Sequence, residues 1–173
     1  VLDIKDIPWA SKQVWAPDCA EKDGKYYFFF PARDKEGFFR VGVAVGDSPK
    51  GPFKAEPDYI KGTFSIDPCI FPDTDKNYYL TFGGIWGGQL DKYRNNVYNE
   101  ANKEPEGDEP AMCPKIAKMN PDMKTLAEEP KDLVIVDENG KPLTGKDHDR
   151  RYFEDPWLFK KGDTYYFTYS TGD

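Results

Sequence analysis

Hydrophobic and polar positions follow the same order in three stretches of the chain, which begin with WAPD in residues 15–32, IDP in 66–84 and FEDP in 153–172. Each stretch opens with an acidic residue beside a proline, continues through a short apolar run to a polar turn, and enters an aromatic strand that starts with Tyr-Tyr. The first and third turns contain Asp23-Gly24 and Gly162-Asp163, residue types that tolerate the positive φ of tight hairpins. The pattern therefore predicts the same β-hairpin three times.

Further strands are expected after the first two hairpins. Residues 39–47 alternate between apolar and polar as a third strand, and a short fourth strand begins at residues 51–54. In the second unit, the expected third and fourth strands are residues 115–119 and 133–136, after a long polar excursion over 86–111. Four antiparallel strands make one blade of a β-propeller, so each unit reads as a blade or part of one.

The chain is therefore expected to be all-β and to form one partial β-propeller. Residues 1–14 are assigned to a connection from a preceding blade, residues 15–62 to a second blade, residues 63–137 to a third blade with a loop insertion, and residues 138–173 to the start of a fourth. The inserted segment is polar and rich in Pro and Gly, which suits a solvated surface loop. Because propellers close with about four to eight blades, we expect further sequence on both sides or association with another chain.

Composition and charge narrow the classes of partner. The net charge of the 173 residues is -7, whereas nucleic-acid binding requires clustered Lys and Arg, so nucleic acid is not expected. No stretch of about 18 apolar residues predicts a membrane span. Aromatic residues make up 16% of the chain and favour pleated surfaces, in agreement with a sheet protein. The cysteines Cys19, Cys69 and Cys113 lack the close spacing of zinc sites and are expected to be buried, unpaired thiols.

The order of the motifs WAPD (15–18), IDP (66–68) and FEDPW (153–157), with an aromatic strand after each, resembles glycoside hydrolase family 43 over nearly the whole chain. This resemblance implies a five-bladed β-propeller, of which the chain would hold roughly blades two to four. It also implies an active site on the central axis with three carboxylates from three blades. The implied activity is cleavage, with inversion, of β-xylosides, α-L-arabinofuranosides or arabinans, without a cofactor.

Two of the three carboxylates have counterparts in this sequence. Glu154 matches the family's general acid, and Asp67 matches the carboxylate that orients the acid and adjusts its pKa. An inverting glycosidase needs an acid to protonate the leaving oxygen, and a raised pKa keeps that proton in place near neutral pH. Phe153 and Trp157 are expected to give Glu154 an apolar setting. Asp155 stands where the family more often has Gly or Ala, so a second carboxylate is expected to perturb the acid.

The third carboxylate, the general base, lies in the first blade of the family, upstream of WAPD. Asp3 and Asp6 precede that motif here, but residues 1–10 resemble the connection out of the first blade. Neither residue is therefore assigned as the base. The 173-residue chain by itself is predicted to be inactive, because without a base no water is activated.

Three other residues are candidates for contacting the sugar. Trp15 resembles the family residue that packs against the apolar face of the sugar at the scissile bond, with core packing as the alternative. Asp18 either hydrogen-bonds sugar hydroxyls or is structural. Trp86, in the Gly-rich segment GGIWGGQ, either forms part of the pocket wall or anchors its loop.

No metal ligand is assigned in the chain. His148, the single histidine, lies in a mixed-charge segment and is expected in a solvated loop. Some members of the family hold calcium on the propeller axis with a histidine from the last blade. The resemblance therefore extends to a structural calcium in the whole protein, held by residues other than these.

The leading interpretation is a glycosidase of β-xylosidase or α-L-arabinofuranosidase type that acts on xylo- or arabino-oligosaccharides. The alternative is a non-catalytic carbohydrate-binding propeller; an Asp-Pro start in blade one would favour the enzyme over it. A protein-interaction propeller would not need Asp67 and Glu154, and the related fructan-cleaving enzymes usually have Cys where Asp155 stands. The resemblance implies a secreted or periplasmic bacterial enzyme, although cytoplasmic members exist. Linkage specificity, exo or endo action and oligomeric state do not follow from these residues.

Overall fold

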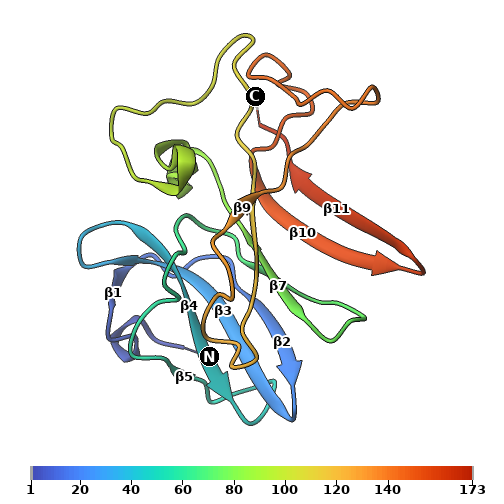
Figure 1. Cartoon of the computed structure of the whole chain (residues 1–173). Coiled ribbons are helices and arrows are strands. Elements are labelled where there is room, and N and C mark those ends of the chain that lie inside the picture. The colour runs from blue at the N-terminus through green and yellow to red at the C-terminus, as the bar shows by residue number, and fades with distance from the viewer. Residues whose placement is uncertain (1, 173) are drawn as a thin grey trace.

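The computed structural model describes residues 2–172, which form three antiparallel β-sheets connected by loops and short 3-10 turns (Figure 1). Val1 and Asp173, the outer ends of two expected segments, lie outside the described residues. The strands of the first sheet are β1 (Ala10–Lys12), β2 (Asp18–Lys22), β3 (Lys25–Asp34), β4 (Phe39–Gly46) and β5 (Lys54–Ala55). Those of the second are β6 (Cys69–Pro72), β7 (Tyr78–Phe82), β8 (Lys115–Lys118) and β9 (Lys131–Asp132), and those of the third are β10 (Glu154–Lys161) and β11 (Thr164–Ser170).

All three predicted hairpins are present, as β2–β3, β6–β7 and β10–β11. Two-residue turns join the strands of the first and third hairpins, with Asp23, Gly24 and Gly162 at φ of 53°, 75° and 60°. A longer loop joins β6 to β7, with Lys76 at φ 66°. Residues that tolerate the left-handed region thus stand where the turns require it, and the hairpin prediction is confirmed.

The fourth strand predicted at residues 133–136 is wrong. The strand that pairs with β8 is β9, two residues earlier, and only an isolated bridge between Val136 and Pro142 forms further on. The N–H of Leu133 still donates to the carbonyl of Pro114 (2.9 Å), but proline has no N–H to return the bond, so the ladder stops there. The apolar residues that suggested a strand are not all buried, since Val134 is 53% exposed.

Residues 1–14 and one cysteine show features that the sequence pattern did not predict. The segment assigned as a connection contains β1, which pairs with the end of β3. Among the cysteines, which are all free, Cys69 is buried and Cys113 is half-buried, but Cys19 is exposed, so its predicted burial is wrong. Side chains alternate between the faces of a strand, and the neighbouring Ala20 takes the buried position on β2. Short 3-10 turns lie before β1 and in the excursion after β7, as η1 (Ile4–Asp6), η2 (Trp86–Gly88), η3 (Leu90–Lys92) and η4 (Arg94–Asn96).

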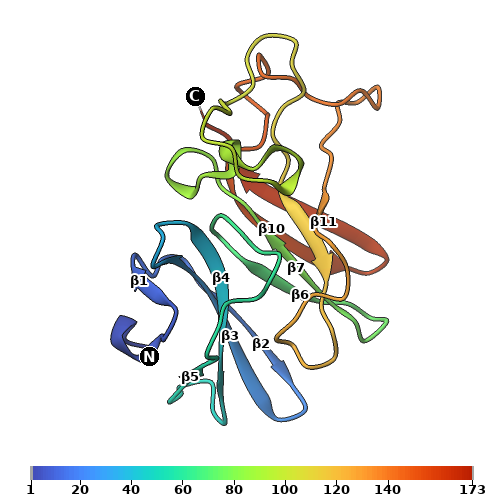
Figure 2. The ribbon, with the colours of Figure 1, turned by 60° about the vertical axis from the view of Figure 1, so that its left-hand side comes forward.

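The first strands of the three hairpins, β2, β6 and β10, lie side by side, each from a different sheet (Figure 2). The N–H of Ile70 on β6 donates to Oδ2 of Asp18 on β2 (2.8 Å). On the other side of β6, the N–H of Leu158 on β10 donates to Sγ of Cys69 (3.4 Å). Three equivalent strands are thereby placed around one region of the molecule.

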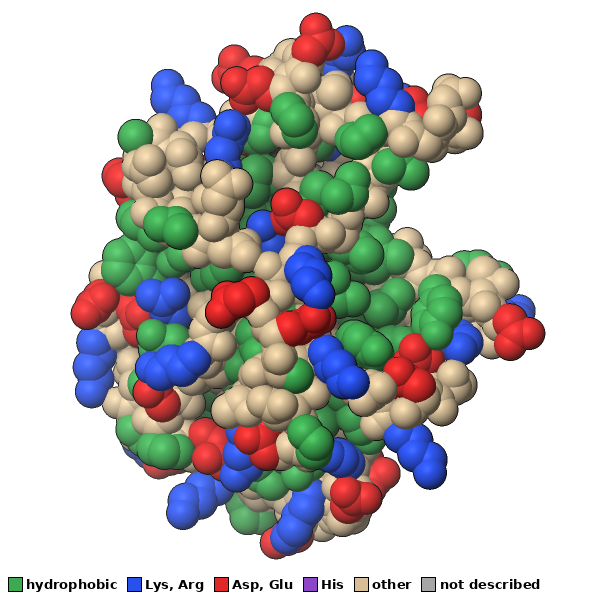
Figure 3. Space-filling model, in the orientation of Figure 1, with side chains coloured by type: hydrophobic (Ala, Val, Ile, Leu, Met, Phe, Trp, Pro, Cys, Tyr) green, Lys and Arg blue, Asp and Glu red, His purple; other side chains and the backbone are tan. Residues whose placement is uncertain are grey.

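The main hydrophobic core lies between the first and second sheets. Phe29 and Val41 of the first sheet meet Leu80 and Phe82 of the second, and all four are fully buried. The third sheet is more open. Its exposed aromatic and apolar side chains gather where the β10–β11 hairpin projects, on the right of the space-filling view (Figure 3).

Candidate active site

The openings of the three repeats converge on one cavity of about 170 Å³. It is lined by Ala16-Pro17 before β2, Asp67-Pro68 before β6, and Asp155-Pro156 with Trp157 on β10. These positions are equivalent in the repeated pattern, so the repetition itself assembles the site. Glu154 is adjacent to this lining but does not belong to it.

Asp67 is the most deeply placed carboxylate of the site. Its residue is 8% exposed, its backbone has a φ of 54°, and its Oδ2 accepts a hydrogen bond from the N–H of Asp155 (3.3 Å). Burial raises the pKa of Asp67 to about 7, and the neighbouring charges of Asp155 and Glu154 act in the same direction. Near neutral pH this carboxyl group therefore holds a proton for part of the time.

Glu154 is the first residue of β10 and is paired with Ser170 on β11. The register shifts between Glu154 and Trp157, and Asp155 in this irregular stretch has a φ of 57°. Such irregularities change the direction of side chains at the end of a strand. Burial raises the pKa of Glu154, and the charge of Asp155 raises it further.

Asp155 links the two predicted acids. Its N–H binds Asp67, while its exposed carboxylate accepts a hydrogen bond from Oγ of Ser170 (3.0 Å). The sequence had identified Asp155 only as a neighbour of Glu154, but its charge acts on Asp67 as well. The signal was present, because Asp-Pro occurs at both 67–68 and 155–156.

Tyr152 was not found by sequence reasoning. Its side chain is buried, its hydroxyl donates to the carbonyl of Gly83, and burial together with the charges of Asp67, Asp155 and Glu154 raises its pKa. A neutral phenol therefore lies beside the carboxylates. Its only sequence signal was the place directly before the FEDPW motif.

Trp15 and Asp18 were both predicted to contact the sugar, but Trp15 is partly exposed whereas both oxygens of Asp18 already accept hydrogen bonds. The Trp15 ring is 39% exposed and lies against Phe39, with ring centroids 4.7 Å apart. The far edge of this ring lies close to Gly87. Both oxygens of Asp18 accept backbone N–H groups, from Cys19 at 2.7 Å and from Ile70 at 2.8 Å, which favours a structural link between sheets.

Trp86, the third predicted contact, is 59% exposed on the short turn η2. Its ring meets Phe153 edge to face, with centroids 4.8 Å apart, so it lies next to the residue before Glu154. Its Nε1 donates to Oε2 of Glu104 (2.6 Å), which forms an ion pair with Arg151. Sequence reasoning missed Glu104 and Arg151, since they are 47 residues apart and neither belongs to a repeat.

The expected apolar setting of Glu154 is only partly supplied by its neighbours. Phe153 is half-buried, whereas Trp157 is 50% exposed and lines the cavity beside Asp67. His148 is exposed, as predicted for a solvated loop. Within residues 2–172, no group of three or more His, Cys, Asp or Glu side chains could hold a metal ion. A calcium ion on the propeller axis stays a prediction about the whole protein.

A larger hollow, of about 420 Å³, lies between the Lys61 turn and the segment 126–130. Its Glu128 forms an ion pair with Lys131, which lowers the pKa of that carboxyl group. An exposed ion pair of this kind is ordinary surface chemistry. The smaller cavity at Asp67 is therefore the better candidate site, because raised pKa values and converging repeats coincide there.

No helix among residues 2–172 is long and apolar enough to span a membrane.

Comparison with known proteins places this site in a family. The family model of glycosyl hydrolases family 43 matches residues 2–173. Xylosidase/arabinosidase 43A of Humicola insolens is 54% identical over 180 residues, which cover 100% of this chain and 55% of that protein. A beta-xylosidase of Xylanibacter ruminicola is 52% identical and is matched over 98% of this chain and 53% of its own length. The chain spans about half the length of the curated relatives it matches.

Solved structures match equally well. The GH43_1 enzyme from Xanthomonas citri complexed with xylose superposes with a TM-score of 0.98 at 53% identity, over 100% of this chain and 53% of that one. CoXyl43, a GH43 beta-xylosidase/alpha-arabinofuranosidase from a compost microbial metagenome, in complex with xylotriose, gives a TM-score of 0.95 at 57% identity, over 99% and 53%. The expected all-β, partial five-bladed propeller is confirmed. The chain belongs to glycosyl hydrolase family 43.

Proposed function

We propose that the whole protein is an inverting glycosidase of β-xylosidase or α-L-arabinofuranosidase type. Glu154 acts as the general acid, and Asp67 orients the acid and adjusts its pKa. The observation that carries this proposal is the meeting of three equivalent strand openings at a cavity beside carboxyl groups with raised pKa values. Structural ion pairs seldom raise carboxyl pKa values, whereas acid catalysis near neutral pH requires it.

The reaction consists of one displacement at the anomeric carbon. Glu154 donates its proton to the glycosidic oxygen as the bond to the anomeric carbon breaks, and water attacks from the opposite face. The general base that takes the proton from this water is not assigned to any residue of this chain. The charge of Asp155 raises the pKa of both Asp67 and Glu154, and the charge of Glu154 also raises the pKa of Asp67.

Xylo-oligosaccharides are the favoured substrates in this proposal. The Xanthomonas citri enzyme is described in complexes with xylose and with xylotriose, and CoXyl43 in complex with xylotriose. The names of the curated relatives add arabinosidase activity. Arabino-oligosaccharides therefore remain in the proposed substrate class.

The test is hydrolysis of nitrophenyl β-xyloside and nitrophenyl α-arabinofuranoside by the whole protein. With xylotriose, whose sugar leaving group needs a proton, the variant Glu154→Gln is expected to reduce kcat by about 10²–10⁴-fold, since an amide cannot supply that proton. Glu138→Gln, which alters an exposed carboxylate facing Arg150, is the matched control and is expected to leave kcat unchanged. Residues 1–173 alone are expected to be inactive.

Proton NMR of the first sugar released tests the stereochemistry. Inversion of a β-xyloside produces α-xylose first. Early β-xylose would contradict the inverting mechanism. A whole protein that binds xylotriose but hydrolyses neither nitrophenyl substrate nor arabinan would instead be the carbohydrate-binding propeller.

A further inference from the structure

The exposed ring of Trp86 is held in an unusual way for a surface side chain. The residue is 59% exposed, yet its backbone has a φ of 52°, a conformation that bulky residues seldom adopt. The ring packs nearly perpendicular to that of Phe153, and the indole N–H donates to Glu104. The ring is therefore held by two neighbours while more than half of the residue remains exposed.

Glu104 is in turn held by a charged partner with little access to water. It forms an ion pair with Arg151, whose residue is 5% exposed. Arg151 also donates to the carbonyl of Pro105 (3.2 Å) and lies 3.1 Å from Nδ1 of His148. Because Arg151 is nearly buried and has several partners, it holds the carboxylate of Glu104 in one place. An ion pair between two exposed, flexible side chains would not do so.

The backbone around Glu104 is joined to the segment that leads into β10. The N–H groups of Ala111, Gly145 and Lys146 donate to the carbonyls of Leu143 (2.9 Å), Glu109 (2.8 Å) and Gly107 (3.0 Å), respectively. A Cβ at Gly145 would collide with the backbone of Pro105, so this close approach requires glycine. The inserted loop is thereby attached to the segment that carries Arg151.

We propose that Glu104 and Arg151 are positioning residues that hold the open face of Trp86 as a stacking surface for a xylose or arabinose ring beside Glu154. This inference rests on the proposed function. An aromatic face suits the apolar C–H face of a sugar, and fixing it before binding reduces the entropy lost on binding. The inserted loop, which carries Glu104, then contributes to substrate binding as well as forming part of the surface.

Binding of xylotriose to the whole protein carrying Glu154→Gln is the primary test, because this variant does not consume the sugar. Titration calorimetry and tryptophan fluorescence are measured in this background. Trp86→Ala is expected to weaken binding at least tenfold and to remove most of the fluorescence change. Glu104→Ala is expected to weaken binding severalfold, and Glu104→Gln less, because glutamine retains one acceptor oxygen.

Kinetics in the otherwise unmodified protein separate positioning from catalysis. Glu104→Ala is expected to raise KM for xylotriose severalfold with kcat within about threefold of the unmodified value. Glu109→Ala is the matched control, because it removes an exposed carboxylate of the same loop that faces Arg94 (3.2 Å). The melting temperature of each variant identifies those that lose structure, and the glutamine variant keeps the test valid if the alanine variant unfolds.

Unchanged affinity and fluorescence in Trp86→Ala would overturn the inference and show that another part of the protein covers this ring. Equal effects of Glu104→Ala and Glu109→Ala would also overturn it. If the unmodified protein hydrolysed no glycoside but bound xylotriose in a manner that depended on Trp86 and Glu104, the proposed function would fail and the stacking surface would stand.

Discussion

The second and third hairpins share a sequence pattern but differ in their surroundings. In both, an aspartate at positive φ precedes a proline, at Asp67 with φ 54° and at Asp155 with φ 57°. Asp67 is buried between neighbouring sheets and its pKa is raised to about 7, whereas Asp155 is exposed. The repeat thus provides the same backbone twice, and the residues packed around each copy determine its chemistry.

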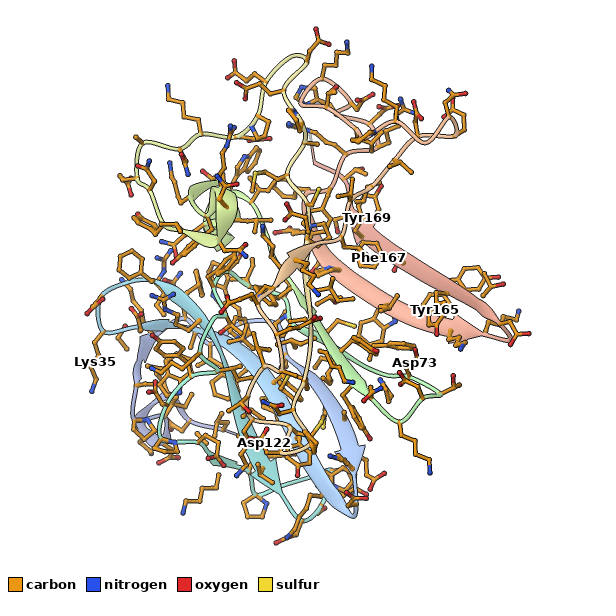
Figure 4. The ribbon with its side chains drawn as sticks, in the orientation of Figure 1. Lys35, Asp73, Asp122, Tyr165, Phe167 and Tyr169 are labelled. Atoms are coloured by element: carbon orange, nitrogen blue, oxygen red, sulfur yellow. The ribbon has the colours of Figure 1, made fainter. Side chains whose placement is uncertain are left out.

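The strands that follow show the same contrast. Leu80, Thr81 and Phe82 of β7 are fully buried. On β11, Phe167 and Tyr169 are half-buried, while Tyr165 reaches Asp73 of the second hairpin through its hydroxyl (2.8 Å) (Figure 4). Within residues 2–172, the second hairpin is packed on both sides, whereas the third has one open face.

The largest expected effect tests this difference in packing. Leu80→Ala should lower the free energy of unfolding by about 2–5 kcal/mol, because it leaves a cavity in a closed core. Phe159→Ala, at a β10 position that is 39% exposed, should cost less than half as much. Urea unfolding of the whole protein measures both changes. Equal costs would show that the open face of the third hairpin is covered in the whole protein.

A smaller effect is expected from Asp67→Asn, and it depends on pH. A carboxyl group with a pKa of about 7 in the folded state and about 4 in the unfolded chain binds more protons when folded, so stability falls as pH rises from 4 to 7. Asparagine removes this dependence. The melting temperature of Asp67→Asn relative to the unmodified protein should therefore be higher at pH 8 than at pH 4.

Asp73→Asn is the control for that measurement. Asp73 also lies in the second hairpin, but hydrogen bonds from Tyr165 and Thr74 outweigh its burial and lower its pKa. Its replacement should be more destabilising at pH 8 than at pH 4, which is the opposite sign. If the two substitutions changed stability with the same dependence on pH, the difference in environment between Asp67 and Asp73 would be contradicted.

The smallest effect is expected from Asp155→Asn, which keeps the N–H that binds Asp67 but removes the charge. Since that charge raises the pKa of both Asp67 and Glu154, its loss lowers both. The acid then loses its proton at lower pH, so the alkaline limb of the profile of kcat against pH should move to lower pH. A limb that stays in place would show that Asp155 does not influence the acid.

Much of the fold could be predicted from the sequence because hairpins depend on local chemistry. Asp23-Gly24 and Gly162 tolerate the turn conformation wherever they occur, and alternating apolar residues define the strands around them. The strand predicted at 133–136 failed because its end depends on Pro114, the residue before the partner strand β8, which no local pattern of that segment records.

The repeated hairpins, the all-β class and the resemblance to the family could be read from the sequence, together with Glu154 and Asp67 as the carboxylates to examine. These inferences follow from short motifs, each of which can be interpreted without knowing which residues pack around it. Three-dimensional packing was needed to show that the N–H of Asp155 donates to Asp67 and that both oxygens of Asp18 accept backbone N–H groups. It was also needed to show that Glu104 and Arg151 hold Trp86. Those contacts join residues far apart in the chain. The effects of burial and charge on a side chain depend on its neighbours in space, which the order of residues does not specify.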